Sequence, residues 1–315
     1  ISCTRSLSES NSNGRESSFM KKAYFQMHLA ILLWGFTGIL GKAIGLSEGM
    51  IVWYRMIISA VGLLPVLLSS KPVLPKGKDL LNISITGLIV ALHWVFFYAS
   101  IKASNVSIAL SCFSSVSLFT AILEPLSRRQ RPKMAEIILG IMVMAGLYII
   151  FSVQQLYFTG ILLAVISALL GATFTILNKT LTSRFEPSVI TFYELVSGFL
   201  LLTVLLPVYF YFTNTGFEIP SGTDLIYLIL LGLVCTSFAF TLSLKALKKL
   251  DAFTLNLSVN LEPLYSIILA VIFFNETTIK NSGFILGTLI ILGSVVLHSW
   301  YKWQKTRKEV TKTAL

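Results

Sequence analysis

Long apolar segments, repeated along the whole 315-residue chain, constrain its fold more than any other feature. A helix needs about 20 mostly apolar residues to cross the hydrocarbon core of a bilayer, which is about 30 Å thick. Ten windows meet that requirement: 24–45, 49–69, 80–101, 104–127, 133–151, 157–178, 188–212, 224–247, 252–275 and 280–300. The breaks between them are too short for a soluble domain. The pattern predicts an all-α integral membrane protein with ten transmembrane helices.

The composition agrees with a chain whose surroundings are lipid. Charged residues make up 12% of the sequence, about half of the roughly 25% that is usual in globular proteins. Hydrophobic residues reach 55%, and the mean hydropathy is +0.80. These values exclude a disordered chain, a nucleic-acid-binding module and most soluble enzymes. The three cysteines are scattered and form no CxxC pattern, so we expect no disulfide framework, no metal site and no cofactor.

The Lys and Arg residues lie almost entirely in alternate loops. With the N-terminus inside the cell, the cytoplasmic segments hold nineteen of them, and the outer loops hold only Lys102 and Lys280. Cytoplasmic loops of membrane proteins carry such an excess of positive charge, which also accounts for the net charge of +11 without a polyanionic partner. We therefore expect both termini in the cytoplasm, an even number of helices and a place in the bacterial inner (plasma) membrane.

The two ends of the chain differ from the apolar body. Residues 1–19 are polar and rich in Ser, and Met20 opens the first apolar run. We expect 1–19 to be a disordered or non-native extension and 302–315 to be a basic cytoplasmic tail. A cleaved signal peptide is the competing interpretation, but the apolar run from Tyr24 to Gly45 is too long for one, and no small-residue cleavage site follows.

The two halves of the chain share a weak similarity that keeps its order. The paired positions are Gly35 with Gly171, Trp53-Tyr54-Arg55 with Phe192-Tyr193-Glu194, Ser100-Ile101-Lys102-Ala103 with Ser243-Leu244-Lys245-Ala246, Ile138-Leu139-Gly140 with Ile285-Leu286-Gly287, and Gly146 with Gly293. Each half, 20–152 and 157–301, contains five predicted helices. Because five is odd, the second half must lie upside down relative to the first, as in the inverted repeats of many secondary transporters. Chance similarity between Leu- and Ile-rich helices is the alternative.

The ninth and tenth windows carry a resemblance to a known family. The residues concerned are Leu261-Glu262-Pro263-Leu264-Tyr265, Phe274-Asn275-Glu276, and Gly283, Gly287 and Gly293. With them the chain resembles EamA-type members of the drug/metabolite transporter superfamily, which typically have a Pro inside the ninth helix, a Glu at its end and glycines in the tenth. The first half departs from this pattern: Ser117 stands near the Pro position, Arg129-Gln130 near the Glu position, and Glu124-Pro125 close to the cytoplasmic end.

The resemblance covers Met20 to about Trp303 and implies two EamA-like repeats of five helices each. Such families export amino acids, other small metabolites or drugs. The resemblance therefore implies a secondary active transporter, an exporter of small metabolites such as amino acids or amphipathic compounds, that works by alternating access between the repeats. The partners that we expect are a small-molecule substrate, the lipid bilayer and protons as the coupling ion, but no nucleic acid. The chain is expected to be a monomer or a homodimer.

Other classes of function remain as alternatives. An integral-membrane enzyme is disfavoured because His28, His93 and His298 lie on different predicted helices and no HExxH, Walker or GxSxG motif is present. No filter-like sequence or appended ligand domain favours a channel or a sensor.

Ionisable side chains inside predicted helices are costly in hydrocarbon, at about 2.5–3.5 kcal/mol each near a helix centre, so each needs a reason. Arg55 lies six residues into the second helix from the outer face, and Glu194 lies six residues into the seventh from the inner face. This places them about 14 Å apart in depth, so a direct salt bridge is not expected. Together with Trp34, we interpret them as lining or gating a transport pathway. Snorkelling or local pairing is the equally weighted alternative.

The third predicted helix carries His93 near its centre, followed by Trp94 and Tyr98. Trp94 and Tyr98 are four residues apart and share one face of the helix. An aromatic wall beside an imidazole suits an amphipathic substrate. The alternative for His93 is a packing role, with its ring bonded to a backbone carbonyl.

The ninth predicted helix is the most polar. Asn256, Asn260 and Pro263 fall on one face, and Glu262 falls on another with Tyr265. Pro263 cannot donate an N–H to the carbonyl of the residue four positions earlier, so we expect a kink there. Kinked midplane helices often line transporter binding sites. We expect Asn256, Asn260, Glu262 and Tyr265 to contact substrate, with Glu262 at about the bilayer midplane. Packing through hydrogen bonds between helices is the alternative.

Overall fold

The computed structural model describes residues 2–70, 72–151, 157–265 and 282–313, and within these residues it contains helices but no strand. The helices are α1 (Ser2–Ala43), α2 (Glu48–Ser70), α3 (Lys78–Ala103), α4 (Val106–Phe113), α5 (Ser115–Ser127), α6 (Met134–Phe151), α7 (Phe158–Leu181), α8 (Pro187–Thr213), α9 (Gly222–Gly232), η1 (Leu233–Phe238), α10 (Ala239–Leu247), α11 (Ala252–Val259) and α13 (Ser282–Thr313). The predicted all-α class is therefore confirmed.

Seven segments are long and apolar enough to cross a membrane. They are Phe19–Ala43, Glu48–Ser70, Lys78–Ala103, Ile108–Ser127, Phe158–Leu181, Pro187–Thr213 and Gly222–Leu247. Shorter apolar helices occupy the predicted fifth and tenth windows, at Met134–Ile149 and Ile285–Tyr301. The ninth window is described only as far as residue 265, so the count of ten spans stays a prediction.

Two of the predicted spans are not continuous α-helices. In the fourth window α4 ends at Phe113 and α5 starts at Ser115, because hydroxyl groups compete for the carbonyls of the helix ladder: Ser115 Oγ donates to Cys112 O at 2.7 Å. In the eighth window α9 passes into the π-helix η1, where Thr236 Oγ1 donates to Leu231 O, five residues back, at 2.7 Å. Each segment is still long and apolar enough to cross a membrane as one span.

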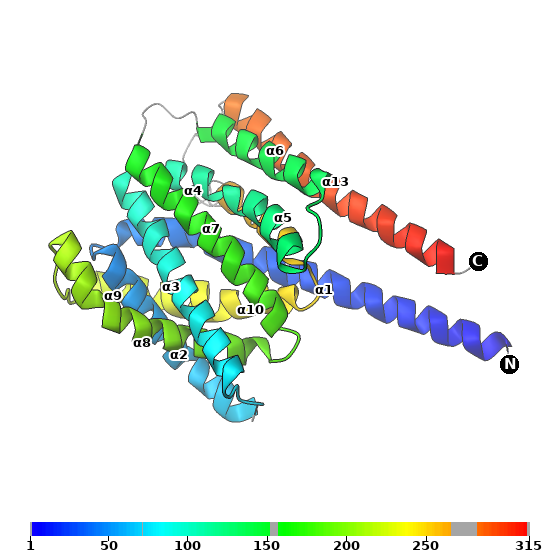
Figure 1. Cartoon of the computed structure of the whole chain (residues 1–315), viewed down its shortest axis with the longest axis horizontal. Helices are drawn as coiled ribbons and strands as arrows, with labels where there is room; N and C mark the ends of the chain where they lie inside the picture. The colour runs from blue at the N-terminus through cyan, green and yellow to red at the C-terminus, as the bar shows by residue number, and fades with distance from the viewer. Residues whose placement is uncertain (1, 71, 152–156, 266–281, 314–315) are drawn as a thin grey trace.

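Helix α1 begins at Ser2 and includes residues 2–19. No Pro interrupts them, and adding turns to an existing helix costs much less than nucleating one. In the same way α13 continues to Thr313 through most of the predicted tail. Whether 1–19 belong to the functional protein stays a prediction. Figure 1 shows both terminal helices extending from the same side of the bundle.

Helix α3 packs against both α7 and α8 near the centre of the bundle, and α6 lies beside α13 (Figure 1). The crossing of α3 with α8 is very close at Gly87, where a Cβ atom would lie 2.9 Å from the Cα atom of Glu194. Ser84 and Ser197 share a hydrogen bond of 3.0 Å across the same crossing. Small residues permit such backbone contact between membrane helices.

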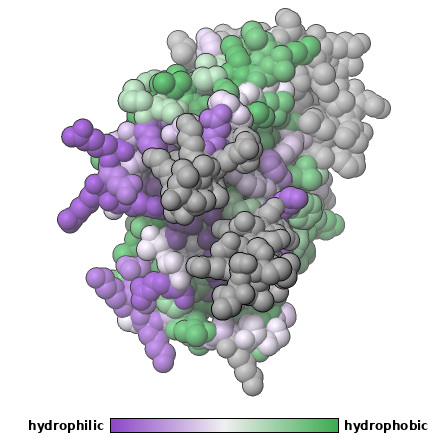
Figure 2. All heavy atoms as spheres, turned by 90° about the vertical axis from the view of Figure 1, so that its right-hand side faces the viewer, coloured by the Kyte–Doolittle hydropathy of each residue, from purple (hydrophilic) through white to green (hydrophobic). Residues whose placement is uncertain are grey.

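The outer surface of the bundle is strongly apolar. Many large hydrophobic side chains are exposed, among them Leu68, Val204 and Tyr211 at 78%, 73% and 79%. Figure 2 looks onto the end at which α5 and α7 finish, and shows hydrophilic side chains gathered beside hydrophobic surface. An exposed apolar belt with polar groups at the helix ends is the surface of a multi-pass integral membrane protein.

One buried carboxylate connects the two halves of the chain at that end. Glu124 forms a salt bridge of 3.0 Å with Arg128, the pairing that their four-residue spacing predicts. Its two carboxylate oxygens also accept the backbone N–H groups of Ala252 and Phe253, at 3.4 and 2.9 Å. These N–H groups begin α11, where the helix dipole favours a negative charge. Glu124 therefore fixes the start of α11 to the end of α5.

Candidate functional site

A pocket lies between helices of both halves and is lined by residues of α1 to α5, of α7, α10 and α11, and by Glu262. Its lining residues are Trp34, Thr37, Arg55, His93, Trp94, Phe97, Phe113, Val116, Gly171, Phe174, Thr175, Asn178, Phe240, Ser243, Leu244, Leu247, Leu255, Asn256, Val259 and Glu262. The pocket is mainly apolar, with a few polar groups, as small-molecule sites commonly are.

Arg55 is the positive charge of this pocket and is held firmly in place. Its Nε donates to Thr236 Oγ1 at 2.6 Å, and its Nη1 donates to Tyr98 Oη at 3.0 Å. The guanidinium carbon lies 3.8 Å from the centre of the Trp94 ring, in cation–π geometry. The side chain is 1% exposed, so it is fixed by these contacts rather than snorkelling to the surface. A fixed guanidinium is a suitable partner for a carboxylate or another planar anion.

Aromatic rings form one wall of the pocket. The His93 ring lies between Phe113 and Phe174, with ring centres 5.3 and 5.2 Å away, and Trp94 meets Phe240 edge-on at 6.2 Å. His93 Nδ1 is also 2.9 Å from the Ser167 backbone oxygen. His93 therefore makes the carbonyl contact expected of a packing residue and borders the pocket as well.

The broken helix α11 contributes a further part of the lining. It ends at Val259, and helical residues resume at Glu262, so the break falls just before Pro263. The missing N–H of Pro263 removes a bond from that turn, and Asn260 Nδ2 donates instead to the carbonyls of Asn256 and Leu257, both at 3.2 Å. The break turns the Glu262 side chain to the pocket while only 7% of it stays exposed.

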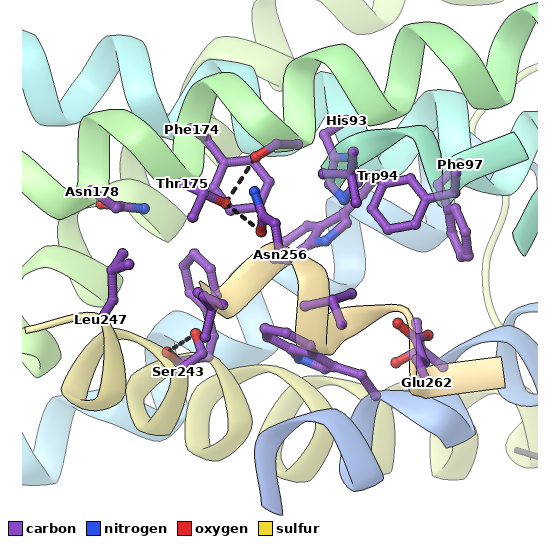
Figure 3. A pocket seen from close by; sticks show the side chains of 18 of the residues that line it. His93, Trp94, Phe97, Phe174, Thr175, Asn178, Ser243, Leu247, Asn256 and Glu262 are labelled. Carbon is purple, nitrogen blue, oxygen red and sulfur yellow. Dashed lines mark hydrogen bonds between the residues drawn. The ribbon is translucent and has the colours of Figure 1, made fainter. Parts of the chain in front are cut away.

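A cluster of polar side chains around Asn256 lies in the middle of the pocket (Figure 3). The Asn256 side chain donates to Thr120 Oγ1 at 2.8 Å and accepts from Thr175 Oγ1 at 3.2 Å, which joins α5, α7 and α11. Figure 3 shows Asn256 in the middle of the pocket, with Asn178 and Glu262 at opposite ends. Asn178 Nδ2 donates to Glu194 Oε2 at 3.4 Å.

The structure brings together six of the residues that the sequence nominated. Trp34, Arg55, His93, Trp94, Asn256 and Glu262 line one pocket. The other nominated residues lie outside its lining: Tyr98 supports Arg55, Glu194 contacts Asn178, Asn260 bonds its own helix, Pro263 follows the break, and Tyr265 Oη lies 2.9 Å from His28 Nδ1. Whether any of these side chains contacts substrate stays a prediction. Phe274, Asn275 and Glu276 lie outside the described residues.

Sequence reasoning did not nominate Thr175 and Asn178, which line the pocket from α7. An Asn inside an otherwise apolar window is a signal that could have found Asn178. Phe174 and Phe240 carry no such signal, because aromatic residues are common throughout the chain. In the part of the chain that is described, no group of three or more His, Cys, Asp or Glu residues could hold a metal ion.

The apolar outer belt and the pocket between two helical halves define a multi-pass membrane protein of the transporter type. The sequence profile of the EamA-like transporter family matches residues 21–152 and 158–300. The chain therefore belongs to the EamA-like transporter family.

Individual relatives agree with that membership. The chain is 24% identical over 261 residues to an uncharacterized transporter, YxxF, of Bacillus subtilis (strain 168), with 80% of this chain and 81% of the relative covered. It is also 24% identical over 267 residues to an uncharacterized transporter of Archaeoglobus fulgidus, covering 81% and 90%. A protein of known crystal structure shares the fold, with a TM-score of 0.69 and 17% identity over 87% of this chain and 96% of that one.

Proposed function

We propose that this protein is a secondary active transporter that exports small metabolites such as amino acids or other amphipathic compounds. The observation that carries the proposal is the pocket between the two halves, in which the Arg55 guanidinium and the Glu262 carboxyl group lie beside aromatic rings. A carboxylate of the substrate would contact the guanidinium of Arg55, and an ammonium group would contact the carboxylate of Glu262. The aromatic wall would take the apolar part, as expected for a site with a few placed polar groups.

Alternating access between two inverted repeats is the mechanism that we propose. The family profile matches two stretches of similar length, 21–152 and 158–300, and both contribute to the pocket walls. Interrupted helices at a site between repeats are typical of secondary transporters. Here the interruptions fall between α4 and α5, at η1 and at the end of α11. Rocking of one half against the other would then open the pocket to each side in turn.

The remaining parts of the proposal concern the setting of the protein. The excess of Lys and Arg in alternate loops supports cytoplasmic termini and a bacterial inner membrane. Protons are the proposed coupling ion, and a monomer or homodimer the proposed state. Chemical conversion of the substrate is not part of the proposal, since membership of a transporter family favours transport over an integral-membrane enzyme, a channel or a sensor.

Proteoliposomes test this function directly. With labelled phenylalanine as a zwitterionic aromatic probe, we expect saturable exchange across the membrane. Two analogues serve as controls: 3-phenylpropionate lacks the ammonium group, and phenethylamine lacks the carboxylate. Both should compete weakly because each leaves Arg55 or Glu262 without a partner. A panel of amino acids and amphipathic compounds without any saturable flux would contradict the proposal. A chemically altered product would instead indicate an enzyme, and an unsaturable flux a channel.

A further inference from the structure

Glu194 is a carboxylate buried in the inner half of α8 with too few hydrogen-bond donors. Its side chain is fully buried, and the described residues give it one donor, Asn178 Nδ2, at 3.4 Å from Oε2. Glu194 Oε1 is buried without a hydrogen-bond partner in the described structure, and so is Asn178 Oδ1. Two adjacent residues, one on α7 and one on α8, therefore each hold a buried acceptor oxygen that lacks a donor.

The position of Glu194 is rigid, so its side chain cannot reach the surface by a shift of the helix. The backbone of α3 at Gly87 packs directly on the Glu194 backbone, and the hydrogen bond between Ser84 and Ser197 holds the crossing one turn away. Glu194 lies seven residues from the start of α8 at Pro187, which is about 10 Å along the helix. The carboxyl group is thus kept below the protein surface on the inner side.

No charge of the surrounding helices neutralises this carboxylate. In the described part of the chain, none of the titratable groups on the helices around it forms a hydrogen bond or an ion pair with Glu194. Arg55 on α2 donates to Thr236 and Tyr98, and Asp79 on α3 pairs with Arg184. His93 on α3 contacts Ser167, and Lys179 on α7 donates to Leu247 O. The side chains of Lys78 on α3 and Lys245 on α10 are exposed.

We infer that Glu194 and Asn178 form the proton-binding site that couples this transporter. The inference rests on the proposed function and adds a site to it. A buried carboxylate without a cationic partner is far cheaper to keep neutral than charged, and a proton on it supplies the donor that the two orphaned oxygens lack. A metal cation fits less well, because hard cations take about six oxygen ligands and these two residues offer only two unpaired oxygens.

The site also has a physical connection to the pocket. Asn178 lines the pocket at the end away from Glu262 and contacts Glu194 on its other side (Figure 3). An Asn amide can donate to a carboxylate of Glu194 or to a substrate, but each N–H serves one acceptor well at a time. Loss of the proton from Glu194 strengthens the hydrogen bond from the Asn178 amide, because an N–H donates more strongly to a charged carboxylate than to a neutral carboxyl group. Substrate contact and proton occupancy are linked in this way through one side chain.

Infrared spectroscopy of the purified wild-type protein tests the site without any substrate. A buried protonated carboxyl group gives a carboxylic acid C=O band, and we expect such a band at neutral pH that disappears in Glu194→Gln and persists in Glu186→Gln. Glu186 is the matched control because it is an exposed carboxylate just before the same helix. If Glu194→Gln does not fold, Asn178→Ala replaces it and should shift the band by changing its hydrogen bond. A band that is absent from the wild type, or that responds to added Na⁺ rather than to pH, overturns the inference.

Transport separates this inference from the proposed function. In proteoliposomes with phenylalanine as the probe, Glu194→Gln should keep exchange at equal pH but lose accumulation driven by a pH gradient. Proton movement recorded by a trapped pH dye should fall to the background of empty vesicles. Exchange that is intact together with accumulation that stays pH-driven would refute the coupling role, although the protein would remain a transporter. A wild type without flux would contradict the proposed function, while the infrared result would still decide whether Glu194 binds a proton.

Discussion

Replacing Glu262 by Gln removes the negative charge of the pocket while keeping the size of the side chain. Glu262 is 7% exposed, lines the pocket and lies at the end away from Asn178. In the proposed function this carboxylate contacts the ammonium group of the substrate. Gln still offers a neutral carbonyl acceptor, so the variant loses only the difference between a charged and a neutral hydrogen bond.

That difference sets the size of the expected effect. Hydrogen bonds to charged groups contribute about 1.5–3 kcal/mol, and neutral ones contribute about 0.5–1.5 kcal/mol. The gap of about 1–1.5 kcal/mol corresponds to an affinity for phenylalanine about 5- to 12-fold weaker, at about 1.4 kcal/mol for each factor of ten. Affinity for 3-phenylpropionate, which has no ammonium group, should not fall. The ratio between the two ligands therefore isolates the contact from any general damage to the pocket.

Competition binding or exchange kinetics on purified Glu262→Gln measures both ligands, with Glu186→Gln as the control. Equal weakening for phenylalanine and 3-phenylpropionate would refute the ammonium contact. Exchange that persists while pH-driven accumulation disappears would move the coupling role from Glu194 to Glu262.

Three further predictions test the packing and the topology. Gly87→Ala should destabilise the protein by about 1–3 kcal/mol, because the added Cβ meets the α8 backbone. Gly222 has open space around it, so Gly222→Ala should not lower the thermal stability measured in detergent. Glu124→Gln should lower the same thermal stability, since the neutral amide loses a dipole interaction of about 0.3–1 kcal/mol at the start of α11; an unchanged value would exclude that role. In an otherwise Cys-less protein, a thiol at exposed Thr215 should react with an impermeant reagent from outside and one at exposed Lys76 only after permeabilisation, and the reverse pattern would invert the proposed orientation.

Much of the architecture follows from the sequence because the bilayer is a demanding solvent. A backbone in hydrocarbon must satisfy its own hydrogen bonds, so apolar windows of about 20 residues fold as helices whatever their neighbours are. The cost of a buried charge likewise singles out Arg55, Glu194 and Glu262 from their place in apolar windows alone.

The packing of the helices determines which side chains share a site, and hydropathy does not predict this. Hydropathy is a property of each segment, whereas a pocket depends on which faces of different segments meet. Only the assembled helices place Arg55 and Glu262 in one pocket, assign Tyr98 to support the guanidinium and turn Tyr265 to His28.

The contacts between distant residues are likewise a product of the fold. Glu124 reaches the start of α11, 128 and 129 residues along the chain, and no local pattern could predict that partner. Asn178 meets Glu194 only because α7 and α8 both pack on α3, where Gly87 lets the backbones approach. The order of the amino acids is thus enough to dictate apolar helices and to mark the side chains that are costly to bury in them. Which of those side chains share a site depends on helix packing, because their partners come from helices far apart along the chain.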